Sequence, residues 1–100
     1  MTNVSSRYFI DLTQPEIAAQ IKRNPMVVLP AGSVEQHGPH LPTGTDIYAA
    51  NVISHAVAEE MDALVLPGGP LGVTPMHMPF EGTLTLTPDT YMKVVEETCV

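Results

Sequence analysis

The feature that most constrains this chain is the segment from Glu35 to Asp46, which has the sequence EQHGPHLPTGTD. It gathers two carboxylates and two imidazoles, although the whole chain of 100 residues contains only four histidines. Alternate side chains of an extended segment project to the same side, so Glu35 and His37 are expected to point together, about 7 Å apart along the backbone. Acids and imidazoles grouped in this way are ligands for a divalent metal ion.

The middle of the segment, residues 38–44, is expected to turn, because proline withholds an amide donor and glycine tolerates turn dihedrals. Such a turn can carry Asp46 back beside Glu35 and His37, where its carboxylate could bridge two ions that lie about 3.5–4 Å apart in two-metal hydrolytic sites. Acids and histidines in such a loop can equally be solvated or cap a helix. Spacing alone leaves these alternatives open. The chain has neither an HExxH motif nor a paired-cysteine zinc pattern.

A family resemblance adds to this pattern. The run Glu35–Pro42 followed by Thr45-Asp46, with Leu29–Ser33 before it, resembles the signature of the creatininase (creatinine amidohydrolase) family. The resemblance extends from about Ile10 to the end of the chain and includes Phe80–Thr83. It implies hydrolysis of an amide C–N bond with the help of two divalent metal ions.

The resemblance also implies roles for individual residues. Glu35, His37 and Asp46 would be metal ligands, with Asp46 bridging the ions and a further His and Glu supplied downstream. Oxygen and imidazole donors suit two ions of Zn²⁺ or Mn²⁺, with Fe²⁺ as another option. The departing nitrogen needs a proton, and His40 is the nearest candidate catalytic residue for this step. A role for His40 in orienting a ligand through a hydrogen bond stays open.

Residues 67–80 are too rich in glycine and proline for regular structure. We expect a long loop on the same sheet edge as the Glu35–Asp46 segment, forming a wall of the substrate site. Residues 77–83 match a family pattern, His-x-x-Phe-x-Gly-Thr, in which Glu81 replaces the usual proline. We do not assign His77 to the metal.

Two short apolar runs, Met26–Leu29 and Ala63–Leu66, are typical of strands buried on both faces of a parallel sheet. Residues 46–62 contain no glycine or proline and repeat apolar residues at helical spacing, so they predict a helix of about four to five turns that covers the sheet. A strand, helix and parallel strand connect with a right-handed crossover. The predicted fold class is α/β, an αβα layered arrangement with a mostly parallel sheet.

Local start signals predict two more helices. Thr13–Glu16 has the form of a capping box and begins a helix that should end near Asn24. Thr87–Asp89 begins the second helix, on which Cys99 is expected to be a buried packing thiol. Because this pattern continues to Val100 without a capping residue, we expect residues 1–100 to be the N-terminal part of a single creatininase-like α/β domain, with more strands and ligands beyond it.

Composition narrows the classes of partner. A net charge of −7, from 11 acids against 4 bases, argues against a surface for nucleic acid or an anionic membrane. A single cysteine excludes an intramolecular disulfide, and the first residues lack the pattern of a signal peptide, so a cytoplasmic location is expected. The expected partners are a small-molecule amide substrate and further copies of the chain in a homo-oligomer.

The predicted function is therefore that of a divalent-metal-dependent amidohydrolase acting on creatinine, a formamide or a related amide, including a peptide bond in a precursor. One alternative is a phosphate- or nucleotide-binding α/β module built on Pro67–Pro70, although no GxGxxG or Gly-Lys-Ser/Thr pattern is present. Another is a catalytically incomplete fragment.

Overall fold

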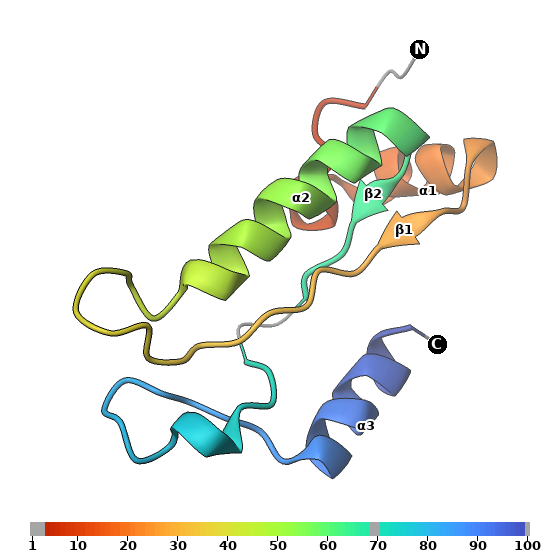
Figure 1. Ribbon diagram of the computed structural model, residues 1–100. Helices are drawn as coiled ribbons and strands as arrows, with labels where there is room; N and C mark the ends of the chain where they lie inside the picture. The colour runs from red at the N-terminus through yellow and green to blue at the C-terminus, as the bar shows by residue number, and fades with distance from the viewer. Residues whose placement is uncertain (1–3, 69–70, 100) are drawn as a thin grey trace. The chain divides into compact units, whose positions relative to one another are not determined.

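The computed structural model describes residues 4–68 and 71–99. Its elements in chain order are η1 (Phe9–Asp11), α1 (Gln14–Arg23), β1 (Val27–Val28), α2 (Thr45–Met61), β2 (Leu64–Val65), η2 (Pro75–His77) and α3 (Pro88–Thr98) (Figure 1). The chain divides into two compact units, the first made of residues 1–30 and 50–68 and the second of residues 31–49 and 69–100. Within the described ranges, no helix is both long enough and apolar enough to cross a membrane.

The sheet of the first unit is a parallel pair of strands, in the register that places Val27 opposite Leu64. β2 is buried, whereas Val27 is 41% exposed. The difference follows from the neighbours of each strand, because Val65 of β2 also forms a bridge with Tyr8 on its other side. β1 has one strand partner among the described residues. The expectation that Met26–Leu29 is buried on both faces is therefore wrong.

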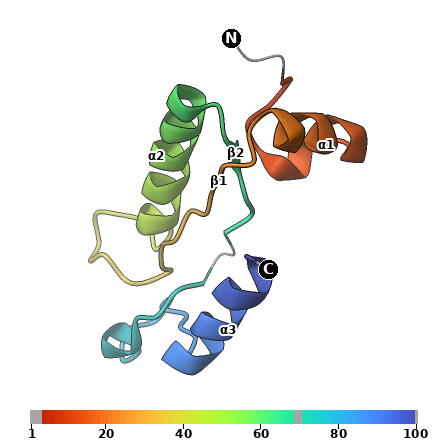
Figure 2. The same ribbon diagram turned by 90° about the vertical axis from the view of Figure 1, so that its right-hand side faces the viewer.

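Helices α1 and α2 lie on opposite sides of the parallel pair, as Figure 2 shows, which confirms the α/β class and its layering. The core cluster is formed by Ala58 of α2 together with Ala63 and Val65. Val57 and Met61 belong to the apolar residues that repeat at helical spacing in 46–62 and were expected to face the sheet, yet both are exposed. A sheet of two short strands covers only a narrow part of a helix surface, which explains why the buried stripe is narrower than predicted.

Both predicted helix starts are confirmed. In α1 the Thr13 hydroxyl accepts a hydrogen bond from the Glu16 amide, and the Glu16 carboxylate accepts one from the Thr13 amide at 2.8 Å. In α3 the Thr87 hydroxyl accepts from the Thr90 amide at 3.3 Å. Cys99, however, follows the last residue of α3 and is exposed, so the prediction of a buried thiol is wrong.

A network around Asp62 joins the end of α2 to the preceding part of the first unit. Asp62 has a left-handed backbone with a φ of 53°. Its carboxylate accepts hydrogen bonds from Arg23 at 2.6 Å and Arg7 at 3.0 Å. Its carbonyl accepts from the side-chain amides of Gln20 and Asn24, each at 2.9 Å. The hydrogen bonds from Arg23, and then from Arg7, hold the pKa of the Asp62 carboxyl well below its ordinary range.

This lowered pKa predicts a specific dependence of stability on pH. The ionised Asp62 carboxylate stabilises the fold above its unfolded pKa of about 3.9, and that contribution is lost as the pH falls towards the folded pKa. We expect Asp62→Asn to lower the urea denaturation midpoint at pH 7 and to weaken the loss of stability below about pH 5. The matched control is Glu60→Gln, which changes an exposed acid near the same end of α2. An Asp62→Asn variant with the wild-type acid profile would contradict the prediction.

Candidate metal centre

The centre begins with a close approach of backbones in the second unit. A Cβ atom added to Gly32 would lie 2.9 Å from the carbonyl oxygen of Asp46 and 3.1 Å from the amide nitrogen of Ile47. Glycine at this position therefore lets the chain lie directly against the first turn of α2. Gly72 packs with similar closeness against Gly32 and Ser33. The backbones at Gly32, Asp46 and Gly72 thus meet directly, with no side chain between them.

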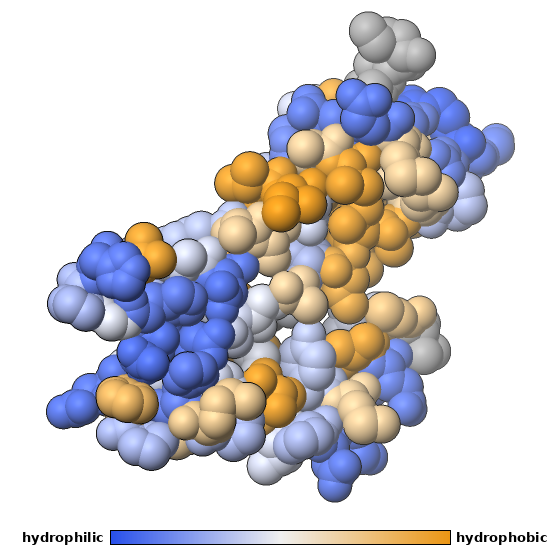
Figure 3. Space-filling view, viewed as in Figure 1, coloured by the Kyte–Doolittle hydropathy of each residue, from blue (hydrophilic) through white to orange (hydrophobic). Residues whose placement is uncertain are grey.

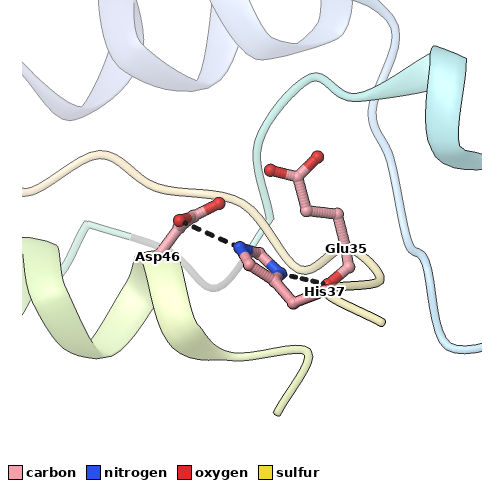
Figure 4. A group of neighbouring side chains, drawn as sticks. All are labelled: Glu35, His37 and Asp46. Atoms are coloured by element: carbon pink, nitrogen blue, oxygen red, sulfur yellow. Dashed lines mark hydrogen bonds and ion pairs between the residues drawn. The ribbon is translucent and has the colours of Figure 1, made fainter. Parts of the chain in front are cut away.

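The side chains of Glu35, His37 and Asp46 converge at this meeting point (Figure 4). Each offers one ligand atom, the three atoms lie within 4.8 Å of one another, and all three residues are half-buried. Glu35 and His37 come from the extended segment, and Asp46 comes from the first turn of α2. Residues 38–44 turn as expected, with a φ of 71° at Gly38. The geometry agrees with the predicted grouping, whereas ligation of a metal stays a prediction.

The position of the His37 proton follows from its contacts. His37 Nδ1 lies 2.9 Å from the backbone carbonyl oxygen of Glu35. Because a carbonyl oxygen can only accept a hydrogen bond, Nδ1 carries the proton. His37 Nε2 faces Asp46 Oδ1 at 3.4 Å. The hydrogen bond to the Glu35 carbonyl raises the pKa of the His37 imidazole, and the charge of Asp46 acts in the same direction. Nε2 of the neutral ring is therefore the nitrogen that can ligate a metal.

The Glu35 carboxylate is held by several groups at once. The Thr74 hydroxyl donates a hydrogen bond to Oε2, and the Ser33 hydroxyl lies 3.0 Å from Oε1. His77 Nε2 is 3.2 Å from Oε2. The hydrogen bond from Thr74 lowers the pKa of Glu35 to about 2, and the hydrogen bond from Ser33 acts in the same direction. Glu35 is thus an ionised and oriented acid at neutral pH.

The described part of the 67–80 loop contacts the Glu35–Asp46 segment through His77. The two ring nitrogens of His77 lie 3.2 Å from Glu35 Oε2 and 3.1 Å from Gln36 Nε2. The group of three residues does not include His77. Residues 69 and 70, on which the phosphate-binding alternative in part depended, lie outside the described residues.

Sequence reasoning missed Ser33 and Thr74, both of which contact Glu35. For Ser33 a signal was available, because it stands two residues before Glu35 and so projects to the same side of an extended segment. For Thr74 no local signal exists, since its contact with Glu35 depends on how the 67–80 loop packs.

His40, the candidate catalytic residue, is exposed. Its imidazole ring lies beside the backbone of Gly38, with Nδ1 3.3 Å from the position of an added Cβ atom. Among the described residues, the His40 side chain makes no hydrogen bond or ion pair with Glu35, His37 or Asp46.

The donor set is chemically suited to a divalent cation. Two carboxylates and one imidazole nitrogen provide the oxygen and nitrogen ligands that Zn²⁺, Mn²⁺ and Fe²⁺ accept. Two of the three side chains come from an extended segment and one from the start of a helix. Sites in α/β enzymes are commonly built in this way, from loops that follow the strands. Fold and site together define the class as an α/β protein with a candidate divalent-metal centre.

Comparisons with known proteins identify the family. Residues 10–100 match the family model Creatininase, described as creatinine amidohydrolase, and the chain belongs to this family. The mycofactocin precursor peptide peptidase of Mycolicibacterium smegmatis is 41% identical over 68 residues, which cover 62% of this chain and 28% of that protein. The creatinine amidohydrolase of Pseudomonas putida is 37% identical over 59 residues, covering 58% of this chain and 23% of that protein.

Solved structures give the same result. A crystal structure of creatinine amidohydrolase is 30% identical with a TM-score of 0.88, and the match covers 96% of this chain and 39% of that chain. A structure described as creatininase Mn is 29% identical with a TM-score of 0.86, covering 93% of this chain and 38% of that chain. The chain thus spans less than a third of the length of the curated relatives that it matches.

The close approach at Gly32 leads to a stability prediction. We expect Gly32→Ala to lower the free energy of unfolding by about 1–3 kcal/mol, the usual cost of overpacking, because the new methyl group would meet the backbone of Asp46. Urea denaturation measures this change. The matched control is Gly44→Ala, whose methyl group would meet the ring of Tyr48 at 3.2 Å and can be accommodated by a small movement of that side chain. Equal stability of the two variants would contradict the interpretation of Gly32.

Proposed function

We propose that the protein is a divalent-metal-dependent hydrolase that cleaves an amide C–N bond. The observation that carries the proposal is the convergence of Glu35, His37 and Asp46, whose ligand atoms lie within 4.8 Å of one another. Membership of the creatininase family supports it. So do the names of two relatives, which describe a peptidase and a creatinine amidohydrolase. The name of a third relative, an inosose hydrolase, supports hydrolysis but not an amide substrate.

In this proposal Glu35, His37 and Asp46 hold the metal, with Asp46 as the bridging ligand and further ligands supplied from outside residues 1–100. Two ions of Zn²⁺ or Mn²⁺ fit the donors, and solved creatininases are described as Mn and Zn-Zn types. Bound there, the ions would supply Lewis-acid activation of an amide carbonyl and of water. The chain itself orients the donors, through Thr74 at Glu35 and through the carbonyl of Glu35 at His37.

The proposed substrate class is an amide. One relative is a peptidase of the mycofactocin precursor peptide, and one solved creatininase is a complex with creatine. A peptide bond and the creatinine ring both contain an amide C–N bond, so the proposal covers the chemistry that these proteins share. The two substrate types can be distinguished by offering the full-length enzyme creatinine and short peptides in parallel assays.

The ligand assignment is tested by removing the proposed bridge. We expect Asp46→Ala in the full-length enzyme to lose bound metal and amidase activity together, because the two ions would no longer share a carboxylate. Elemental analysis of the purified protein measures the metal. The matched control is Asp89→Ala, which removes an acid from the first turn of α3 as the test variant does from α2, and which should retain its metal. Unchanged metal content in Asp46→Ala would reject the assignment.

We also propose that His40 protonates the departing nitrogen, because imidazole is a common general acid and His40 is exposed beside the turn of the metal-binding segment. His40→Ala is then expected to lower kcat by about 10²–10⁴-fold with metal content unchanged. The control is His55→Ala, since His55 stacks on Tyr8 in the first unit. Wild-type kcat in His40→Ala would reject the role, and a loss of metal would show that His40 orients a ligand instead.

A further inference from the structure

Ser33 is the residue at which the two carboxylates of the candidate centre meet. Its hydroxyl oxygen lies 3.0 Å from Glu35 Oε1 and also 3.0 Å from Asp46 Oδ2. A serine hydroxyl has one proton, so it donates to one of these oxygens at a time or shares the proton between them. In either case a single oxygen atom bridges the two proposed acidic ligands.

The place of Ser33 is set by backbone packing. Gly32, the residue before Ser33, packs against the carbonyl of Asp46. Gly72, from another segment, packs against the Cα atom of Ser33. Because side chains alternate along an extended segment, Ser33 projects to the same side as Glu35. The hydroxyl therefore reaches both carboxylates from a fixed Cα position and through a short side chain with one rotatable bond.

Ser33 adds to the contacts that hold the carboxylates of Glu35 and Asp46 in place. Glu35 has Oε1 at Ser33 and Oε2 at Thr74, while Asp46 has Oδ2 at Ser33 and Oδ1 facing His37. One oxygen of each carboxylate thus lies at Ser33, while Glu35 Oε2 accepts from Thr74 and Asp46 Oδ1 faces Nε2 of His37. Without the Ser33 hydroxyl, the two negative charges would repel each other with no donor between them.

We propose that Ser33 is a positioning residue of the metal centre, which sets the separation and orientation of Glu35 and Asp46 before a divalent ion binds. This inference rests on the proposed function, because it assumes that the two acids are ligands. Groups that orient metal ligands typically contribute about 10–100-fold to metal affinity. Removal of the Ser33 hydroxyl is therefore expected to weaken metal binding by about 10–100-fold while every proposed ligand remains in place.

The experiment titrates metal-free full-length protein with Mn²⁺ by isothermal calorimetry. Ser33→Ala should raise the Kd for Mn²⁺ by about 10–100-fold with the stoichiometry unchanged, and Ser33→Thr, which keeps a hydroxyl, should restore much of the affinity. Ser33→Gly provides a second variant without the hydroxyl. Thr45→Val is the matched control, because the Thr45 hydroxyl donates to the carbonyl of Pro42 and stands next to Asp46 without contacting a carboxylate.

The outcomes separate this inference from the proposed function. If Ser33→Ala and Ser33→Gly bind Mn²⁺ with wild-type Kd while Asp46→Ala does not bind it, Ser33 has no positioning role and the metal centre stands. If Asp46→Ala also binds with wild-type Kd, the proposed function itself fails. A weakened Kd that appears equally in Thr45→Val would assign the effect to general loosening of the segment and would overturn the role of Ser33.

Discussion

The candidate metal centre of the second unit holds two carboxylates, those of Glu35 and Asp46, close together. Glu35 and Asp46 repel each other at short range, and a folded chain can hold them only if donors face their oxygens or a cation lies between them. The protein supplies the hydroxyls of Ser33 and Thr74 as donors. These hydroxyls hold both side chains in place and keep Glu35 ionised, and an ionised, fixed carboxylate is the form that ligates a metal most readily.

Asp62, in the first unit, is stabilised in a different way from Glu35 and Asp46. Its carboxylate is paired with two guanidinium groups, those of Arg7 and Arg23, so its charge is already neutralised within the protein. Among the described residues, Glu35 and Asp46 form no ion pair with an arginine or a lysine. The same type of side chain is therefore structural in one unit and a candidate ligand in the other, and the difference lies in whether the neighbouring donors carry full positive charge.

Local signals in the sequence predicted local structure well. The capping box at Thr13 and the N-cap at Thr87 need only neighbouring residues, and both are present. The turn that returns Asp46 towards Glu35 was predictable because proline cannot continue a strand or helix and glycine tolerates turn dihedrals. Family resemblance then gave chemical meaning to a grouping that spacing alone left ambiguous.

The features that were missed depend on packing between distant segments. Exposure of β1 depends on which strands flank it, and the contacts of Thr74 and His77 with Glu35 depend on how a loop without regular structure lies against another loop. The exposed thiol of Cys99 has a similar cause, because helical periodicity identifies a face but not what covers it. Single-sequence patterns contain none of this information.

The pairing of β1 with β2 closes a chain segment that runs from Val28 to Leu64 and contains the whole of residues 35–46. The entropy lost in closing a chain segment rises only with the logarithm of its length, and each doubling costs about 0.6 kcal/mol. Extra residues inserted within 38–44 would therefore cost the sheet little. The shape of that turn can change over evolutionary time while the strands and the three grouped side chains stay in place.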